Sequence, residues 1–155
     1  MQLTRYTDYA LRVLIYLAHK DGELATIGEI AAAYGISENH LMKIVHGLGK
    51  QGYIETLRGK GGGLRLGRAP EAINLGAVVR DTEETLHVVE CLADDYEGAC
   101  RLTPSCRLKT VLQEAQDAFY RQLDGYTLRD LIAKRPATVP VRFHPPATAG
   151  RRTRV

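Results

Sequence analysis

The sequence predicts a mainly α-helical fold with a small β wing, namely a winged helix-turn-helix domain followed by a long dimerisation helix. Apolar residues recur at helical spacing through residues 4–50. Two short extended segments then flank a glycine-rich loop at residues 58–63, which is typical of a β-hairpin. Further along, residues 105–123 carry an apolar stripe at steps of three and four.

The first helix is expected to begin behind Thr4 or Thr7, because either hydroxyl can accept a hydrogen bond from a free backbone N–H of the first turn. It is expected to end near Asp21 and Gly22. Its core-facing side consists of apolar residues at helical spacing: Ala10, Leu11, Leu14, Ile15, Leu17 and Ala18.

The next two helices form a helix-turn-helix pattern. Thr26 and Glu29 have capping-box spacing, so a short helix is predicted behind Thr26 and ends at Gly35. Ser37 is the expected N-cap of a helix over residues 38–50. Two helices joined by a short turn that contains glycine are typical of this DNA-binding motif.

The hairpin that follows has the position and the charge of a wing. Its predicted strands are residues 53–57 and 64–66, and the loop between them reads Arg-Gly-Lys-Gly-Gly-Gly. The glycines let the backbone approach a phosphate surface closely. The loop lacks the residue order of a nucleotide-binding loop, and the alternative to a DNA-binding wing is a surface hairpin without a ligand.

Nine side chains are candidates for contacts with double-stranded DNA. Six precede or lie off the apolar stripe of the second helix of the motif: Ser37, Glu38, Asn39, His40, Lys43 and His46. Three belong to the wing: Arg58, Lys60 and Arg65. The alternative is that these are ordinary solvated side chains.

The second half of the chain is predicted to contain three more helices. Asn74 is the expected cap of a helix that runs to Asp81, and Thr127 is the candidate cap of a last short helix. Between them, the helix over 105–123 has an apolar face larger than a small winged domain can cover, so we expect it to form the core of a homodimer. This face consists of Leu108, Val111, Leu112, Ala115, Ala118, Phe119 and Leu123.

Three cysteines lie within sixteen residues, at Cys91, Cys100 and Cys106, and the other 139 residues contain none. Such a cluster in a cytoplasmic protein indicates metal or redox chemistry and not structural disulfides. Three thiolates can hold three irons of a [4Fe–4S] cluster, whose fourth iron then needs another ligand. Zinc with a fourth ligand such as His87 is an alternative, and three free thiols are another.

The charge distribution divides the chain into three segments. Residues 1–68, the winged helix-turn-helix domain, have nine basic against six acidic residues, a net charge of +3. Residues 69–133, the cluster-binding loop and dimerisation helix, have six against twelve, or −6. Residues 134–155 have six basic residues, none acidic, and four of the six prolines, so we expect a disordered basic tail.

Several function classes find no support in the sequence. No apolar run approaches the roughly 20 residues needed to cross a bilayer, and the N-terminus lacks the layout of a signal peptide, so we expect a soluble cytoplasmic protein without membrane contact. An enzyme is not expected, because no nucleophile–base arrangement, paired carboxylates or phosphate loop is present and the five histidines are scattered.

Several motifs resemble those of one known family. Residues 3–12 (LTRYTDYALR) and 57–64 (LRGKGGGL) look like the opening and the wing of the winged-helix iron–sulfur regulators, a family that includes IscR. The segments around the three cysteines, together with residues 118–119 and 123–128 (LDGYTL), are similar to the NsrR branch of that family in particular. The resemblance covers residues 1–133.

The resemblance implies a homodimeric repressor that binds DNA with its cluster intact and releases it when nitric oxide attacks the iron. It favours a [4Fe–4S] over a [2Fe–2S] cluster. Asp8 is at the position where the NsrR branch has an acidic fourth ligand, delivered from the other subunit, and Arg12 is one turn away to orient it. IscR-like members have a ligand histidine where this chain has Lys109.

Alternatives remain open at this point. The alternative for Asp8 is that it is only a negative charge at the start of a helix. The alternatives to nitric oxide sensing are a regulator that senses iron or cluster status and a zinc-stabilised DNA-binding protein. In each case two-fold symmetry predicts a palindromic operator with half-sites about one helical turn apart.

Overall fold

The computed structural model describes residues 2–98, 100, 102 and 105–132, so the predicted basic tail lies outside the described residues. Helices dominate and a two-stranded antiparallel sheet forms the hairpin, which confirms the predicted fold class. The elements are α1 (Arg5–His19), α2 (Ile27–Tyr34), α3 (Glu38–Lys50), β1 (Ile54–Leu57), β2 (Gly63–Leu66), η1 (Pro70–Ala72), α4 (Leu75–Thr82), η2 (Glu90–Leu92), α5 (Arg107–Asp124) and α6 (Leu128–Ile132).

Polar caps set the helix starts. Thr4, and not Thr7, is the N-cap of α1: its Oγ1 accepts a hydrogen bond from Thr7 N at 3.2 Å, and Thr7 is buried inside the helix. Both halves of the predicted capping box at Thr26 are present. Ser37 accepts from His40 N at the start of α3, and Asn74 accepts from Ala77 N at the start of α4. Each cap supplies a partner that the first turn otherwise lacks.

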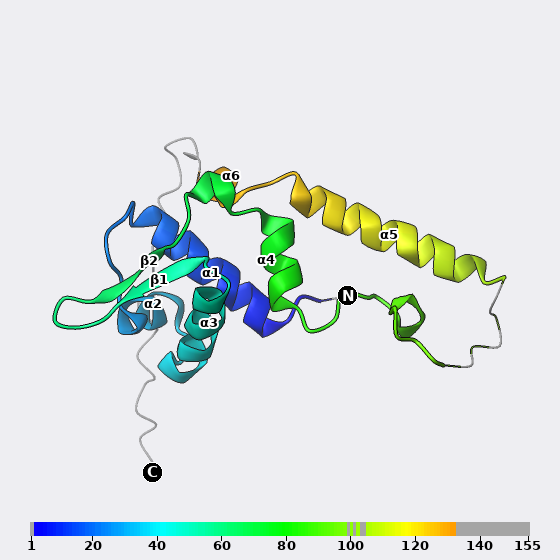
Figure 1. Ribbon diagram of the computed structural model, residues 1–155, viewed down its shortest axis with the longest axis horizontal. Coiled ribbons are helices and arrows are strands. Elements are labelled where there is room, and N and C mark those ends of the chain that lie inside the picture. The colour runs from blue at the N-terminus through cyan, green and yellow to red at the C-terminus, as the bar shows by residue number, and fades with distance from the viewer. Residues whose placement is uncertain (1, 99, 101, 103–104, 133–155) are drawn as a thin grey trace, which may run out of the picture.

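The hydrophobic core joins the helix-turn-helix to parts of the second half. α1 runs through the middle of the body, with α2, α3, α4 and α6 around it (Figure 1). Each fully buried Leu or Ile side chain contributes about 1.5–3 kcal/mol relative to an exposed one. This packing fixes which face of α3 is solvent-exposed. The largest aliphatic side chains without exposure are Leu14, Ile30, Leu41, Leu48, Ile73 and Leu128.

The hairpin is anchored at its base and free at its tip. β1 and β2 pair antiparallel, with Ile54 opposite Leu66, and Leu64 exchanges two backbone hydrogen bonds with Ala25, just before α2. At the tip, a Cβ on Gly62 would lie 2.2 Å from the carbonyl oxygen of Leu57, so only glycine fits there.

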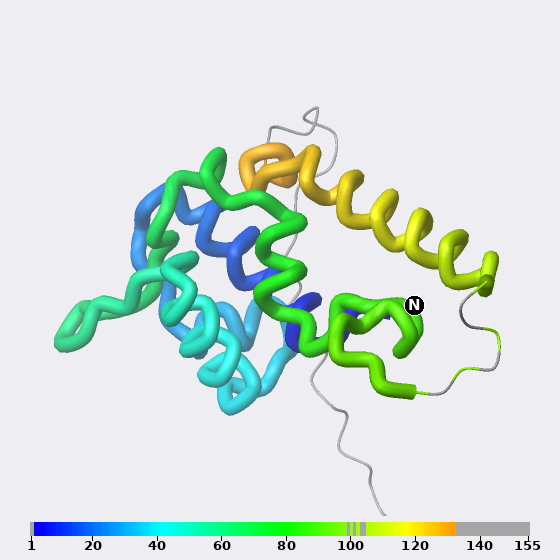
Figure 2. The backbone as a smooth tube through the Cα atoms, turned by 45° about the vertical axis from the view of Figure 1, so that its right-hand side comes forward, coloured from blue at the N-terminus to red at the C-terminus, as the bar shows by residue number. Residues whose placement is uncertain are grey.

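The second half folds back on the first and then extends away from it. Leu75 N donates to Tyr126 O and Leu128 N donates to Ile73 O, so the two ends of the segment from α4 to α6 meet. α5 projects from the body on the side opposite to the hairpin (Figures 1 and 2). Its one buried residue is Gln116, whereas Leu108 and Val111 on its apolar face are 60% and 50% exposed.

Candidate functional site

Helix α3, the second helix of the helix-turn-helix, presents its polar face to solvent. Its apolar stripe of Leu41, Ile44, Val45 and Leu48 is buried, and all six predicted DNA-contact residues, from Ser37 to His46, are exposed. Ser37 has a second role as the N-cap. The N-terminal half of α3 is therefore accessible to a DNA groove.

Met42 is a candidate that the sequence reasoning did not name. It lies on α3 between the polar candidates and is 50% exposed. Its position outside the apolar stripe was the available signal, but an apolar residue was not considered for DNA contact. An exposed apolar side chain on a recognition helix suits contact with a thymine methyl group.

The hairpin places its three basic candidates differently. Arg58 and Lys60 are exposed in the turn, next to glycines with positive φ at 59 and 61. Arg65 lies on β2 and is paired with Glu55 on β1, with Nε and Nη2 at 3.0 and 2.8 Å from Oε2. Arg58 and Lys60 are thus the stronger candidates for phosphate contact, because the charge of Arg65 is partly neutralised.

The three cysteines border one segment between the body and α5. Cys91 is in η2, which packs against α5, and Cys106 is the N-cap of α5. All three cysteines are half-buried. Among the described residues, no three His, Cys, Asp or Glu side chains are close enough to hold a metal ion. The single chain therefore supplies the donors without bringing them together.

The chemistry of these donors fits an iron–sulfur cluster. Cys106 is the N-cap residue of α5, and its side chain makes no capping hydrogen bond there. Three thiolates are the soft ligands that iron–sulfur clusters take. His87, the alternative zinc ligand, has a buried Nδ1 without a hydrogen-bond partner among the described residues, but no cysteine joins it in a metal-binding group.

Asp8 and Arg12 form the pair that their spacing predicted. Arg12 Nε is 3.0 Å from Asp8 Oδ1, and its Nη2 is 2.9 Å from Oδ2. Both side chains are nearly half exposed, on the first turns of α1. The bidentate geometry orients the carboxylate of Asp8, and its role as a ligand stays a prediction.

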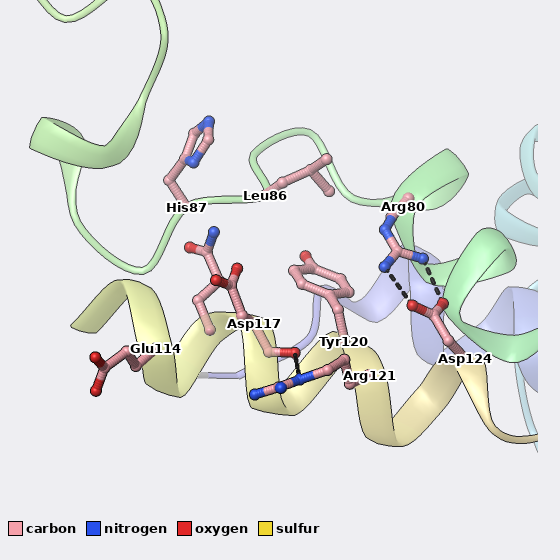
Figure 3. A pocket seen from close by; sticks show the side chains of 9 residues that line it. Arg80, Leu86, His87, Glu114, Asp117, Tyr120, Arg121 and Asp124 are labelled. Carbon is pink, nitrogen blue, oxygen red and sulfur yellow. Dashed lines mark hydrogen bonds and ion pairs between the residues drawn. The ribbon is translucent and has the colours of Figure 1, made fainter. Parts of the chain in front are cut away.

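A groove of 630 Å³ separates the segment before Cys91 from α5 (Figure 3). Leu86 and His87 line one side of this groove, and Asp117 and Tyr120 line the other. Gln116, which also lines the groove, is buried and accepts a hydrogen bond from Val88 N at 2.9 Å. The chain that leads to Cys91 is therefore attached to the middle of α5.

Comparison with known proteins identifies the family. Residues 3–134 match the Rrf2 family, described as iron-dependent transcriptional regulators. The chain belongs to the Rrf2 family. Two relatives, both named HTH-type transcriptional regulator NsrR, support this: the protein of Bacillus subtilis strain 168 is 56% identical over 85% of this chain and 90% of its own length. The protein of Geobacillus kaustophilus is 58% identical over 87% of this chain and 92% of its own length.

Solved structures of transcriptional regulators have the same fold as this chain. CymR of B. subtilis, described as its global cysteine regulator, has 31% identity and a TM-score of 0.68 over 84% of this chain and 95% of its own. T. potens IscR has 26% identity and a TM-score of 0.67, and the match covers 84% of this chain and 85% of the IscR chain. This Rrf2 protein is therefore a DNA-binding transcriptional regulator and not an enzyme, as predicted. In the described part of the chain, no helix is long and apolar enough to cross a membrane.

Proposed function

We propose that this Rrf2 regulator is a homodimeric repressor whose iron–sulfur cluster, [4Fe–4S] rather than [2Fe–2S], senses nitric oxide and controls DNA binding. The observation that carries the proposal is the position of Cys91, Cys100 and Cys106 in one segment between the DNA-binding body and α5. The relatives named HTH-type transcriptional regulator NsrR support the DNA-binding, regulatory part of this function. A cytoplasmic location belongs to the proposal, because thiols stay reduced there.

Dimerisation follows from α5. Its exposed apolar residues lie on one face of a helix that projects from the body, and a second copy of α5 buries them by symmetry. Two copies then present two α3 helices to a palindromic operator. In this arrangement, residues 1–68 contact DNA and residues 69–133 carry the cluster and the dimer contact.

The cluster is held by the three cysteines, with Asp8 of the second subunit as the fourth ligand. When bound, it supplies iron that nitric oxide attacks. A carboxylate is a hard ligand among soft thiolates, so the iron that Asp8 would hold is the one whose ligand would be displaced most easily. The Arg12 guanidinium orients the Asp8 carboxylate.

The decisive experiment is spectroscopy of anaerobically purified protein followed by titration. We expect a visible absorption band, about four irons per chain, and loss of operator binding on addition of nitric oxide. If oxygen or iron chelation releases the protein from the operator but nitric oxide does not, the result would instead support a sensor of iron or cluster status. A colourless protein that contains zinc would refute the cluster.

The wing is tested by salt dependence. Lys60→Ala removes an exposed cation at the tip, so the slope of log K against log salt should fall by about one if this lysine neutralises one phosphate. Arg65→Ala is expected to change the slope less, because Glu55 already pairs with that guanidinium. Fluorescence anisotropy with labelled operator measures both slopes. An unchanged slope for Lys60→Ala would remove this residue from the interface.

A further inference from the structure

The last turn of α4 has an arrangement that the proposed function does not use. Three charged residues within four positions, Arg80, Asp81 and Glu83, each contact a different element. Val78 and Val79, which precede these residues in α4, are fully buried. α4 is therefore fixed to the body, while its last turn joins elements that lie far apart in the sequence. We call these three residues the α4 junction.

Arg80 connects the junction to α5. Its Nη1 and Nη2 donate to Asp124 Oδ1 and Oδ2 at 2.6 and 2.8 Å, and the guanidinium lies 4.6 Å from the centre of the Tyr120 ring (Figure 3). The bond from Arg80 lowers the pKa of Asp124, so this pair is ionised at neutral pH. A Cβ on Gly76 would lie 1.9 Å from Asp124 Oδ1, so α4 and the end of α5 approach closely.

Asp81 connects the junction to the recognition helix and the wing. Its Oδ2 accepts a 2.6 Å hydrogen bond from the Tyr53 hydroxyl, and its backbone oxygen accepts from Gln51 Nε2 at 2.8 Å. Gln51 is the C-cap of α3. Tyr53 is 2% exposed, its N–H donates to Leu48 O in α3, and its carbonyl accepts from Gly67 N behind β2. The Asp81 partners thus fix both DNA-contacting elements.

Glu83 connects the junction to α1. Its Oε1 accepts hydrogen bonds from Thr4 N at 2.8 Å and Thr4 Oγ1 at 3.2 Å. Thr4 is the N-cap of α1, and Asp8 lies in the first turn that follows. Beyond Glu83 the chain runs directly to Cys91, with Val88 attached to Gln116 of α5 on the way. The start of α1, the C-terminal end of α5 and the chain that leads to Cys91 are therefore each connected to this turn.

We propose that Arg80, Asp81 and Glu83 are the positioning residues that couple the cysteine segment and α5 to the recognition helix and the wing. The proposal rests on the proposed function, because it concerns how a change at the cysteines reaches DNA. The bonds are specific in geometry, and each joins a different element to one rigid helix. A displacement of α5 or of the segment before Cys91 is thereby passed through α4 to Gln51 and Tyr53, at the end of α3.

The first test reads this coupling without the cluster. Asp124→Asn in the full-length, cluster-free protein removes the ionised partner of Arg80 on α5. We expect faster amide hydrogen exchange in residues 48–54, at the end of α3, with unchanged exchange in α2. Glu71→Gln is the matched control, because it breaks an exposed ion pair with Arg129 on the body, away from the junction. Equal exchange in Asp124→Asn and wild type would overturn the proposal.

The second test measures how strongly the cluster controls DNA binding. Operator affinity is determined with and without the reconstituted cluster for wild type, Tyr53→Phe, Asp81→Asn and the double variant. Coupling of ordinary size changes affinity by about 5- to 150-fold. We expect the cluster absorption to be unchanged in all variants. The ratio of operator affinity with the cluster to operator affinity without it should be at least about fivefold smaller in each single variant than in wild type. The double variant should show little further change in this ratio.

The outcomes separate the two proposals. If wild type binds DNA equally with and without the cluster, the proposed function fails, whereas faster exchange in Asp124→Asn still supports the junction. If wild type shows the cluster effect but Tyr53→Phe and Asp81→Asn keep its full size, the junction is refuted. An equal loss of both affinities also refutes it, because that result shows a structural role alone. Tyr53→Phe keeps the buried ring, so it is the variant that preserves the fold.

Discussion

At the residue scale, Glu29 shows how one carboxylate joins two helices. It accepts hydrogen bonds from Tyr16 OH at 2.9 Å, from Thr26 N at 3.3 Å and from Lys20. The bond from Lys20 is the main cause of the lowered pKa of Glu29. This one side chain thus links α1 to the start of α2.

The lowered pKa of Glu29 gives a pH-dependent prediction. A carboxylate with a folded pKa below its usual value of 4.5 stabilises the protein above that value, and this contribution is lost as the pH falls through the folded pKa. Glu29→Gln should therefore lower the urea midpoint at pH 7, and the difference from wild type should narrow below about pH 4.5. Glu71→Gln serves as the control. A difference that stays constant with pH would contradict the assignment.

Asp8 gives the second prediction at this scale. Asp8→Cys should yield an all-thiolate site that reacts more slowly with nitric oxide, because a soft ligand is harder to displace from iron. Asp8→Ala should still assemble a cluster on three thiolates but bind DNA more weakly. Stopped-flow absorbance compares the three rates. Indistinguishable rates with unchanged spectra would leave Asp8 as a charge at the helix start, paired with Arg12.

Individual side chains were the hardest feature to predict from the sequence. The exposure of the α3 candidates followed from helical periodicity, and the Asp8–Arg12 pair followed from its i, i+4 spacing. The pairing of Arg65 with Glu55 depends on the register of the hairpin, which the sequence did not specify. The junction bonds, such as Tyr53 to Asp81, join residues 28 positions apart, and local patterns carry no information on them.

At the element scale, helix starts were predicted well because their signals are local. The caps Thr4, Thr26, Ser37 and Asn74 each bond to a backbone N–H three residues away, so their spacing is visible in the sequence. The 3-10 turns η1 and η2 were not predicted, because elements of three residues have no hydrophobic period. The long amphipathic helix was predicted from residue 105 and begins at Arg107.

The exposed face of α5 gives a prediction at this scale. Val111→Glu places a charge in the middle of the proposed dimer contact, where it would be buried without a partner, so the dimer Kd should rise by about 100-fold or more. Sedimentation velocity at several concentrations measures it. Glu114→Gln, elsewhere on the same helix, should leave the dimer intact. A Val111→Glu dimer of wild-type affinity would show that another surface joins the subunits.

At the scale of the whole molecule, the core and the cysteine segment are separate. The main hydrophobic core contains no described residue between Val78 and Leu128. The sequence located the three cysteines but not their arrangement, because on our proposal the assembled site needs both the cluster and a second chain. Apolar periodicity within one chain is enough to locate the core, whereas the described cysteines lie apart in that chain.

This separation predicts that removal of the cysteines does not unfold the protein. Cys91→Ala, Cys100→Ala and Cys106→Ala should each lose the iron-linked colour and tight operator binding, while their unfolding free energies stay within about 1 kcal/mol of the cluster-free wild type. Circular dichroism with urea titration measures this. Leu14→Ala, in the centre of the core, should cost about 2–5 kcal/mol by comparison. A cysteine variant with full cluster occupancy would remove that residue from the ligand set.

The folded state of the regulator does not depend on the cysteine segment, because the hydrophobic core excludes that segment. On our proposal, a molecule that has lost its iron therefore keeps its folded body, and a new cluster can be assembled on the same protein. After a pulse of nitric oxide, gene silencing should therefore return at the speed of iron and sulfide supply, even when protein synthesis is stopped.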